Sequence, residues 1–205
     1  MKFVQDDNFN EYVENSSKIF VLEPPMLGYT FNTLYEDPNC FLKIKKQFQN
    51  PYFEYENHFV VAMHFRGTDF AEWNPIACLA AEYYIRAAEY CVKKYGDRRI
   101  IFSLFTDDLT IESYRRTIDY LKENDYFFNE GNPQRNLGEE CYNISISDIV
   151  VSSPSTFAIT ASMLGKKKTI IHSKEWCDYS IKRNDTVWVE MLKNKSDYYQ
   201  IECVL

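Results

Sequence analysis

The chain has 205 residues, of which 45% are hydrophobic and 26% are charged, the balance of a globular domain with a sizeable core. Aromatic residues make up 17% and only 6 residues are glycine, which argues against a disordered or low-complexity chain. The formal net charge of −7 excludes a generally basic, nucleic-acid-binding character, so any phosphate group that the protein binds must be held by a local site.

Two further features of the sequence indicate the cellular compartment. The six cysteines are scattered and none form a C-x-x-C pair, which favours reduced thiols over a zinc site or a disulfide framework. The chain turns acidic directly after its first residues, and it contains no apolar run of about 18 residues. We therefore expect a cytoplasmic protein without a membrane span.

Residues 1–55 form a short, irregular lead-in in this interpretation. A short strand is predicted at residues 18–22, stopped by Pro24 and Pro25, and a helix is predicted to end at Gln49 before Pro51. No linker separates this part from the remainder of the chain.

From His58 onwards, predicted strands and helices alternate. The strands cover residues 59–65, 100–105, 126–128, 149–151, 169–172 and 199–205. The helices cover residues 75–95, 111–121, 139–145, 156–164 and 186–194. This alternation predicts an α/β fold, a Rossmann-like parallel sheet with helices on both faces.

The first of these helices has clear end signals. Asn74 fits the N-cap and Pro75 the first helical position, while Gly96 fits the stop. Apolar residues at helical spacing connect the two ends, and they place Cys78 and Cys91 on the buried face.

Polar residues follow three of the apolar strands. They form the clusters His64/Arg66/Asp69, Thr106/Asp107/Asp108 and Ser152/Ser153/Ser155/Thr156. The carboxyl ends of parallel strands meet at one edge of the sheet, which is where open α/β sheets bind ligands. We therefore expect the three clusters to form one site.

Arg66 is the central candidate in the first cluster. Its guanidinium is always charged and offers a planar fork of donors that fits phosphate oxygens. Gly67 would let the backbone turn sharply or approach a ligand closely. The same residues also fit an Arg–Asp pair that only braces a loop. His64, next to Arg66, is expected to stay neutral, as a core histidine or as a hydrogen-bonding group.

The other two clusters also have two interpretations. Ser155 and Thr156 lead into a helix, so they can form an anion site or merely cap that helix. Asp107 or Asp108 can accept hydrogen bonds from a sugar hydroxyl or a base N–H, or can cap the helix after Thr110.

Several common fingerprints are absent from the sequence. It has no G-x-G-x-x-G, no G-x-x-x-x-G-K-[ST] and no G-x-S-x-G segment. Dinucleotide-dependent dehydrogenases, P-loop NTPases and nucleophile-elbow hydrolases therefore lose most of their support.

Three segments together resemble a known enzyme family. Residues 64–70 (HFRGTDF) resemble the H-x-R-x-x-D motif of GDP-fucose-dependent fucosyltransferases, the α-1,2 class with its α-1,6 and protein O-fucosyl relatives. Residues 102–108 (FSLFTDD) are similar to the family's strand ending in F-S-D-D or A-T-D. Residues 147–157 (SDIVVSSPSTF) are similar to its late motif, and the order and rough spacing agree over about residues 58–172.

The resemblance implies a function and a set of site residues. The fold would be the donor-binding half of a GT-B glycosyltransferase, which moves fucose from GDP-fucose to a glycan acceptor with inversion and without a metal or other cofactor. Residues 56–205 would be the nucleotide-sugar-binding domain, and residues 1–55 a lead-in or a reduced acceptor-side region. Arg66 would bind the pyrophosphate and stabilise departing GDP.

The remaining implied roles are binding of the phosphate groups, binding of guanosine and removal of a proton from the acceptor hydroxyl. Ser155 and Thr156 would bind phosphate and Phe157 would lie beside the base, while His64 and Asp107 would contact guanosine. Asp69 and Glu72 are candidate catalytic bases by position only, and Asp69 could instead brace Arg66.

Two other functions stay open at this point. The domain could be a non-catalytic nucleotide- or glycan-binding module of the same fold. It could also be an unrelated α/β hydrolase that uses Asp107 and Asp108 with a metal ion.

Overall fold

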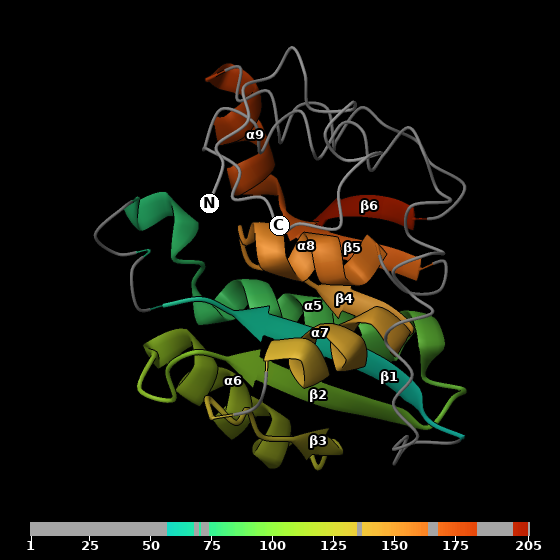
Figure 1. Ribbon diagram of the computed structural model, residues 1–205. Coiled ribbons are helices and arrows are strands. Elements are labelled where there is room, and N and C mark those ends of the chain that lie inside the picture. Colours follow the sequence, from blue (N-terminus) through green and yellow to red (C-terminus); the bar gives the residue numbers. More distant parts are fainter. Residues whose placement is uncertain are drawn as a thin grey trace, which may run out of the picture.

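The computed structural model describes residues 57–67, 70, 74–134, 137–163, 168–183 and 199–204. Within these residues, six strands form one sheet in the order β3-β2-β1-β4-β5-β6 (Figure 1). The strands are β1 (Phe59–Phe65), β2 (Ile100–Thr106), β3 (Phe128–Asn129), β4 (Ile149–Val151), β5 (Lys168–Ser173) and β6 (Tyr199–Val204). Every neighbouring pair is parallel, as the sequence predicted.

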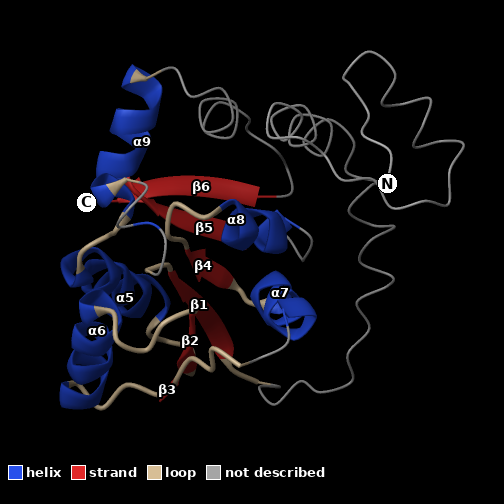
Figure 2. Cartoon of the chain, turned by 60° about the vertical axis from the view of Figure 1, so that its left-hand side comes forward, coloured by secondary structure: helices blue, strands red, loops and turns tan. Residues whose placement is uncertain are grey.

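The connections between the strands are helical. They are the 3₁₀ helix η2 (Pro75–Ala77) and the α-helices α5 (Ala81–Tyr95), α6 (Glu112–Glu123), α7 (Leu137–Ile146), α8 (Thr156–Met163) and α9 (Lys174–Lys182). Figure 2 shows α5 and α6 on one face of the sheet and α7 and α8 on the other. The predicted α/β architecture with helices on both faces is therefore confirmed.

The central strand explains why the sheet needs both layers. All seven residues of β1 are buried, so the strand has no solvent face. Phe59, Val61, Met63 and Phe65 pack into the core beneath α5 and α6. Ala62 packs with residues of α7 and α8 on the opposite face. A strand covered on both faces reads as an unbroken apolar run, which is the signal that the sequence carried.

The direction of strand succession reverses between β1 and β4. The chain runs outward from β1 through β2 to β3, and the second half runs outward from β4 through β5 to β6. This reversal is a topological switch point, where neighbouring connections leave toward opposite sides and open a crevice at the carboxyl ends of the strands.

Two tyrosines at the start of α5 donate hydrogen bonds to backbone carbonyls at this edge of the sheet. The Tyr84 hydroxyl donates to the His64 carbonyl at 3.1 Å. The Tyr83 hydroxyl lies 3.0 Å from the Ser152 carbonyl and 2.9 Å from the Ile171 carbonyl. The first turn of α5 therefore bonds to the carboxyl ends of β1, β4 and β5 together.

The helix predicted at residues 75–95 is divided in the structure. Asn74 does cap a helix, since its side chain accepts from the Ile76 amide at 3.2 Å, but that helix is only the single turn η2. Extended backbone at Ala80 separates it from α5. Cys78 lies in this break and is exposed, so its predicted place on a buried face is wrong, whereas Cys91 is buried. Apolar residues keep helical spacing across the break, so the sequence pattern does not reveal the break.

The last part of the chain contains a helix that the sequence interpretation missed. Helix α9 buries Trp176, Cys177 and Ser180. The predicted elements at residues 18–22, before Gln49 and at 186–194 lie outside the described residues, as does the proposed lead-in 1–55. In the part of the chain that is described, no helix has both the length and the apolar character needed to cross a membrane.

The tyrosine contacts predict a measurable stability difference. Tyr83→Phe leaves the buried Ser152 carbonyl without its hydroxyl donor, so the free energy of unfolding should fall by about 1–3 kcal/mol. Tyr90 is the matched control because its hydroxyl bonds to Lys94 at the surface, and Tyr90→Phe should change stability by less than about 0.5 kcal/mol. Urea unfolding of both variants measures the free energy of unfolding. Equal decreases in the two variants would contradict a stabilising role of the Tyr83 hydroxyl.

Candidate functional site

A buried hydrogen bond joins the two strands at the switch point. The Nδ1 atom of His64, in β1, lies 2.8 Å from the Oγ atom of Ser153, which follows β4. The Ser153 amide also donates to the His64 carbonyl at 3.2 Å. Both side chains are buried, with exposed fractions of 4% for His64 and 1% for Ser153. The two halves of the sheet are thus held together at the point where the crevice opens.

His64 is neutral in this position. Its pKa is lowered to about 4, mainly because burial disfavours the imidazolium, while Asp107 raises it and Arg66 lowers it. The sequence predicted a neutral histidine but attributed it to Arg66, whose effect is the smallest of the three. A neutral imidazole has one donor and one acceptor nitrogen, which suits it to hydrogen bonding.

Arg66 is paired with a carboxylate from the neighbouring strand. Its Nη1 atom lies 3.0 Å from Oδ2 of Asp107, and the Gly67 amide donates to Oδ1 of the same carboxylate at 3.2 Å. The guanidinium also lies over the Phe70 ring, 5.4 Å from its centroid. The Arg66 side chain is 33% exposed, so a ligand at the sheet edge can reach it. Asp107 therefore braces the Arg66 loop, and Asp69 lies outside the described residues.

Gly67 leaves room for the Ile111 side chain. A methyl group on its Cα would overlap Cδ1 and Cγ1 of Ile111, the residue that precedes α6. Its backbone does not have a positive φ, so the conformational freedom of glycine is not the reason for it. The turn after β1 thus lies directly against the residue before α6, and the strand register, with Phe65 beside Thr106, places Arg66 next to Asp107.

Asp108 has a local structural role. Its Oδ1 accepts from the amide and the hydroxyl of Thr110, each at 2.7 Å, and these bonds lower its pKa. Asp108 therefore closes the turn before α6, and the predicted capping of that helix is wrong, because its N-cap is Ile111 and no side chain bonds there. The two adjacent carboxylates contact different partners, Asp107 on the β1 side and Asp108 in its own turn.

The start of α8 lies next to His64. The Phe157 ring centroid is 6.0 Å from that of His64, and Phe157 is partly buried. Ser155 is buried and uses its own amide to donate to the Ser153 carbonyl at 2.7 Å, whereas Thr156 is exposed. A phosphate at this helix would thus meet hydroxyl groups and the first-turn amides that follow Ser155, which lack partners inside a helix.

The structure brings together much of the predicted site. His64, Arg66, Gly67, Asp107 and Ser153, connected by the bonds above, form what we call the switch-point cluster. They come from the ends of β1, β2 and β4, which are three of the elements that the sequence singled out.

Three residues were missed by the sequence interpretation as individual contributors. Ser153 was named only as one of several hydroxyls, and Tyr83 was included only among the apolar residues at helical spacing. Tyr84 was not noted at all. A signal existed for the tyrosines, because a buried tyrosine hydroxyl needs a partner and strand-end carbonyls lie where α5 begins.

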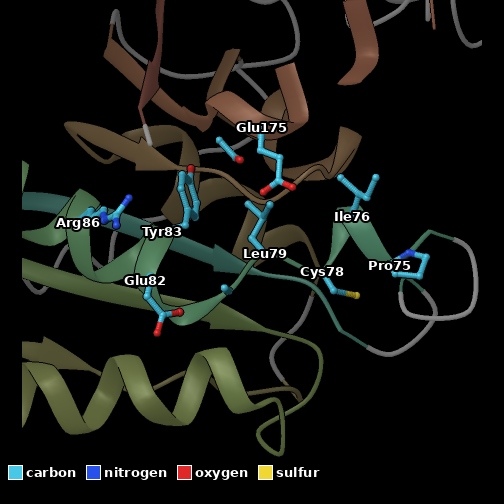
Figure 3. A pocket seen from close by; sticks show the side chains of 10 residues that line it. Pro75, Ile76, Cys78, Leu79, Glu82, Tyr83, Arg86 and Glu175 are labelled. Atoms are coloured by element: carbon cyan, nitrogen blue, oxygen red, sulfur yellow. The ribbon is translucent and has the colours of Figure 1, made fainter. Parts of the chain in front are cut away.

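A separate cavity of about 470 Å³ lies at the same edge of the sheet, between the start of α5 and the start of α9 (Figure 3). Its lining includes Leu79, Tyr83 and Glu175 but no member of the switch-point cluster. Across the described ranges, no group of three or more His, Cys, Asp or Glu side chains is arranged to hold a metal ion.

Comparisons of the chain with models of protein families, with curated proteins and with solved structures find no match. Any functional proposal therefore rests on the sequence motifs described above and on the geometry and chemistry of the site.

The buried histidine predicts an acid-sensitive fold. The unfolded chain binds a proton on His64 below pH 6.5, whereas the folded chain does so only near pH 4. Stability should therefore be fully present above pH 6.5 and should fall as the pH decreases toward 4. His64→Asn should make this decrease shallower, whereas Ser153→Ala keeps the histidine and should retain it. Denaturant unfolding at a series of pH values distinguishes the variants, and identical slopes for all would contradict a buried neutral His64.

The tight packing of Gly67 gives a second prediction. Gly67→Ala should destabilise the protein by about 1–3 kcal/mol, because an added methyl group overpacks the site. Gly67→Ala combined with Ile111→Ala should recover part of that loss, since the smaller side chain vacates the space. Ile111→Ala alone is the reference, and additive losses in the double variant would show that the two residues do not compete for space.

Proposed function

We propose that this protein is an inverting, metal-independent glycosyltransferase that moves fucose from GDP-fucose to a glycan acceptor. The observation that supports this best is the switch-point cluster. The three segments that resemble fucosyltransferase motifs meet there, through the His64–Ser153 bond and the Arg66–Asp107 pair.

Arg66 is the proposed pyrophosphate-binding group. It lies at the carboxyl edge of the sheet, is a third exposed, and is aimed by Asp107 and by the Phe70 ring. In a metal-independent transfer, the negative charge that develops on the leaving diphosphate must be stabilised by fixed positive groups. Arg66 would supply one such group, and the hydroxyls and amides at the start of α8, with Ser155 and Thr156, would supply the others.

The guanosine would lie near His64 and Phe157. The partly buried Phe157 ring can pack against a base, and the neutral His64 can accept or donate one hydrogen bond without a charge. Asp107 would contribute to donor binding through Arg66, and its remaining lone pairs could also accept from guanine.

The transfer itself would be a single displacement. An acceptor hydroxyl oxygen attacks the anomeric carbon from the side opposite the diphosphate, the bond from that carbon to the phosphate oxygen breaks, and a base takes the hydroxyl proton. Asp69 is the proposed base. The proposed partners are thus a nucleotide-sugar donor and a glycan, and the net charge of −7 argues against nucleic acid.

Nucleotide binding gives the first test of this proposal. GDP should raise the thermal unfolding temperature without added Mg²⁺ and in the presence of a chelator. Arg66→Ala should weaken GDP binding by about 1.5–3 kcal/mol or more, since each bond to a charged donor contributes about that much. Arg98→Ala makes the same charge change at the exposed chain after α5, remote from the cluster, and should leave the affinity unchanged.

Calorimetric titration of GDP into the three proteins measures these affinities. Equal GDP affinity in parent and Arg66→Ala would eliminate the pyrophosphate role, and a strict Mg²⁺ requirement would favour the hydrolase alternative. Turnover of GDP-fucose then separates a transferase from a binding module that retains only the nucleotide site.

Asp107 gives a second test, which separates its two proposed contributions. If Asp107 acts by aiming Arg66, Asp107→Asn should weaken GDP, ADP and UDP binding by similar factors. If it also contacts guanine N1–H and N2–H₂, the preference for GDP should fall in addition, by about 1–3 kcal/mol. Asp108→Asn is the matched control because its carboxylate is held by Thr110, and it should change neither quantity. A parent protein without any preference for GDP would refute the guanosine assignment.

A further inference from the structure

The cavity between α5 and α9 lies at the same sheet edge as the switch-point cluster but takes no part in it. One wall is the segment that follows β1, with Ile76, Leu79 and Arg86. The other wall comes from the end of β5 and the start of α9, with Ser173 and Glu175. Figure 3 shows Glu175 facing Leu79 across the opening. The volume of about 470 Å³ is in the range of small-molecule sites.

The walls of this cavity are tied to the switch-point cluster. Tyr83 lines the cavity, and its hydroxyl bonds to the carbonyl of Ser152, directly before Ser153. Its neighbour Tyr84 bonds to the His64 carbonyl. On the other side, the Asn74 side-chain amide donates to the Tyr179 hydroxyl at 3.1 Å, which joins the start of η2 to α9. The wall of the cavity is therefore hydrogen-bonded to the strand ends that carry the cluster, and two reacting groups need such a fixed relative placement.

The chemistry of the lining selects the kind of ligand. Its charged groups are two carboxylates, Glu82 and Glu175, and one guanidinium, Arg86. The backbone amide of Glu82 bonds to its carboxylate and Arg116 pairs with it, and both hold the pKa of Glu82 below its ordinary value. The cavity therefore has no excess of positive charge to hold a diphosphate, so it differs in character from the Arg66 site.

A neutral hydroxylated ligand fits this lining. The carboxylate of Glu175 can accept hydrogen bonds from hydroxyl groups, and the guanidinium of Arg86 can donate to them. Ile76, 38% exposed, and Leu79 present an apolar surface against which the C–H face of a pyranose ring can pack. We infer that this cavity binds a neutral sugar unit of the acceptor glycan, an inference that rests on the proposed transferase function.

Cys78 provides a direct readout of occupancy. Cys78 is one of the residues that line the cavity and is exposed, so its thiol can be alkylated by iodoacetamide in the intact protein. Site-resolved mass spectrometry follows its alkylation rate in the presence of methyl β-galactoside, methyl β-N-acetylglucosaminide or methyl α-mannoside, with glycerol as the viscosity control. At least one glycoside should slow alkylation of Cys78 severalfold. Alkylation of Cys141, on α7 across the sheet, should not change.

The Glu175→Gln variant tests the recognition chemistry. It keeps the side-chain shape but removes the charge, so the glycoside concentration needed for half-protection should rise about tenfold. Glu139→Gln is the matched control, since Glu139 is exposed on α7 on the other face, and it should behave like the parent. Protection that Glu175→Gln leaves undiminished would overturn the recognition proposed here.

Failure of this inference is distinguishable from failure of the proposed function. If GDP binds and no glycoside protects Cys78, the sugar site is refuted and the donor site stands. If a glycoside protects Cys78 and GDP does not bind, the sugar site stands and the transferase proposal is refuted. Protection of Cys78 by GDP alone would place the nucleotide in the cavity and overturn the inference.

Discussion

The arrangement of the site depends on one buried contact, the hydrogen bond between His64 and Ser153. At the switch point, β1 and β4 are distant in sequence and pair over only three residues. Beyond these three residues, the segments that follow the two strands would otherwise diverge toward opposite faces of the sheet. The side-chain bond at 2.8 Å and the backbone bond from Ser153 to the His64 carbonyl extend the connection past the end of β4. They fix α8 and the Arg66 loop as neighbours.

The electrostatics of the cluster suit it to bind an anion beside the Arg66–Asp107 pair. Asp107 holds Arg66 in place, but both side chains are partly exposed, and exposed ion pairs contribute only about 0.2–1 kcal/mol. Because the guanidinium is a third exposed, a diphosphate could bind it while Asp107 keeps it in position. His64 beside them is kept neutral by burial, so it adds no charge that would change with pH near neutrality. The positive character of the site then depends on Arg66 and on the start of α8.

The fold was largely readable from the sequence, and for a physical reason. Strands buried on both faces give unbroken apolar runs, so β1, β2 and β4 appeared within a residue of their observed bounds. Helix α9 and the break before α5 were not readable. Trp176, Cys177 and Ser180 do lie at helical spacing, but α9 has only nine residues and Ser180 is polar, so the apolar pattern is short. The residues around Cys78 keep a helical period through a non-helical turn.

The sequence predicted where the site lies, but not which of its residues contact one another. Parallel strands had to bring the three polar clusters to one edge, and they do. The partner of Arg66 could not be read, because both Asp69 and Asp107 were suitable carboxylates and the choice depends on register and on how closely Gly67 approaches α6. The roles of Tyr83 and Tyr84 depend in the same way on where α5 begins.

The central claim is that a guanine nucleotide binds at the switch-point cluster, and amide hydrogen exchange with and without GDP tests it most directly. The account predicts slower exchange on adding GDP in peptides that cover the ends of β1, β2 and β4 and the start of α8. It predicts no change around Arg98 and Arg99, which lie before β2 at the opposite edge of the sheet. Exchange that GDP leaves unchanged at the cluster, or slows only elsewhere, would contradict the account.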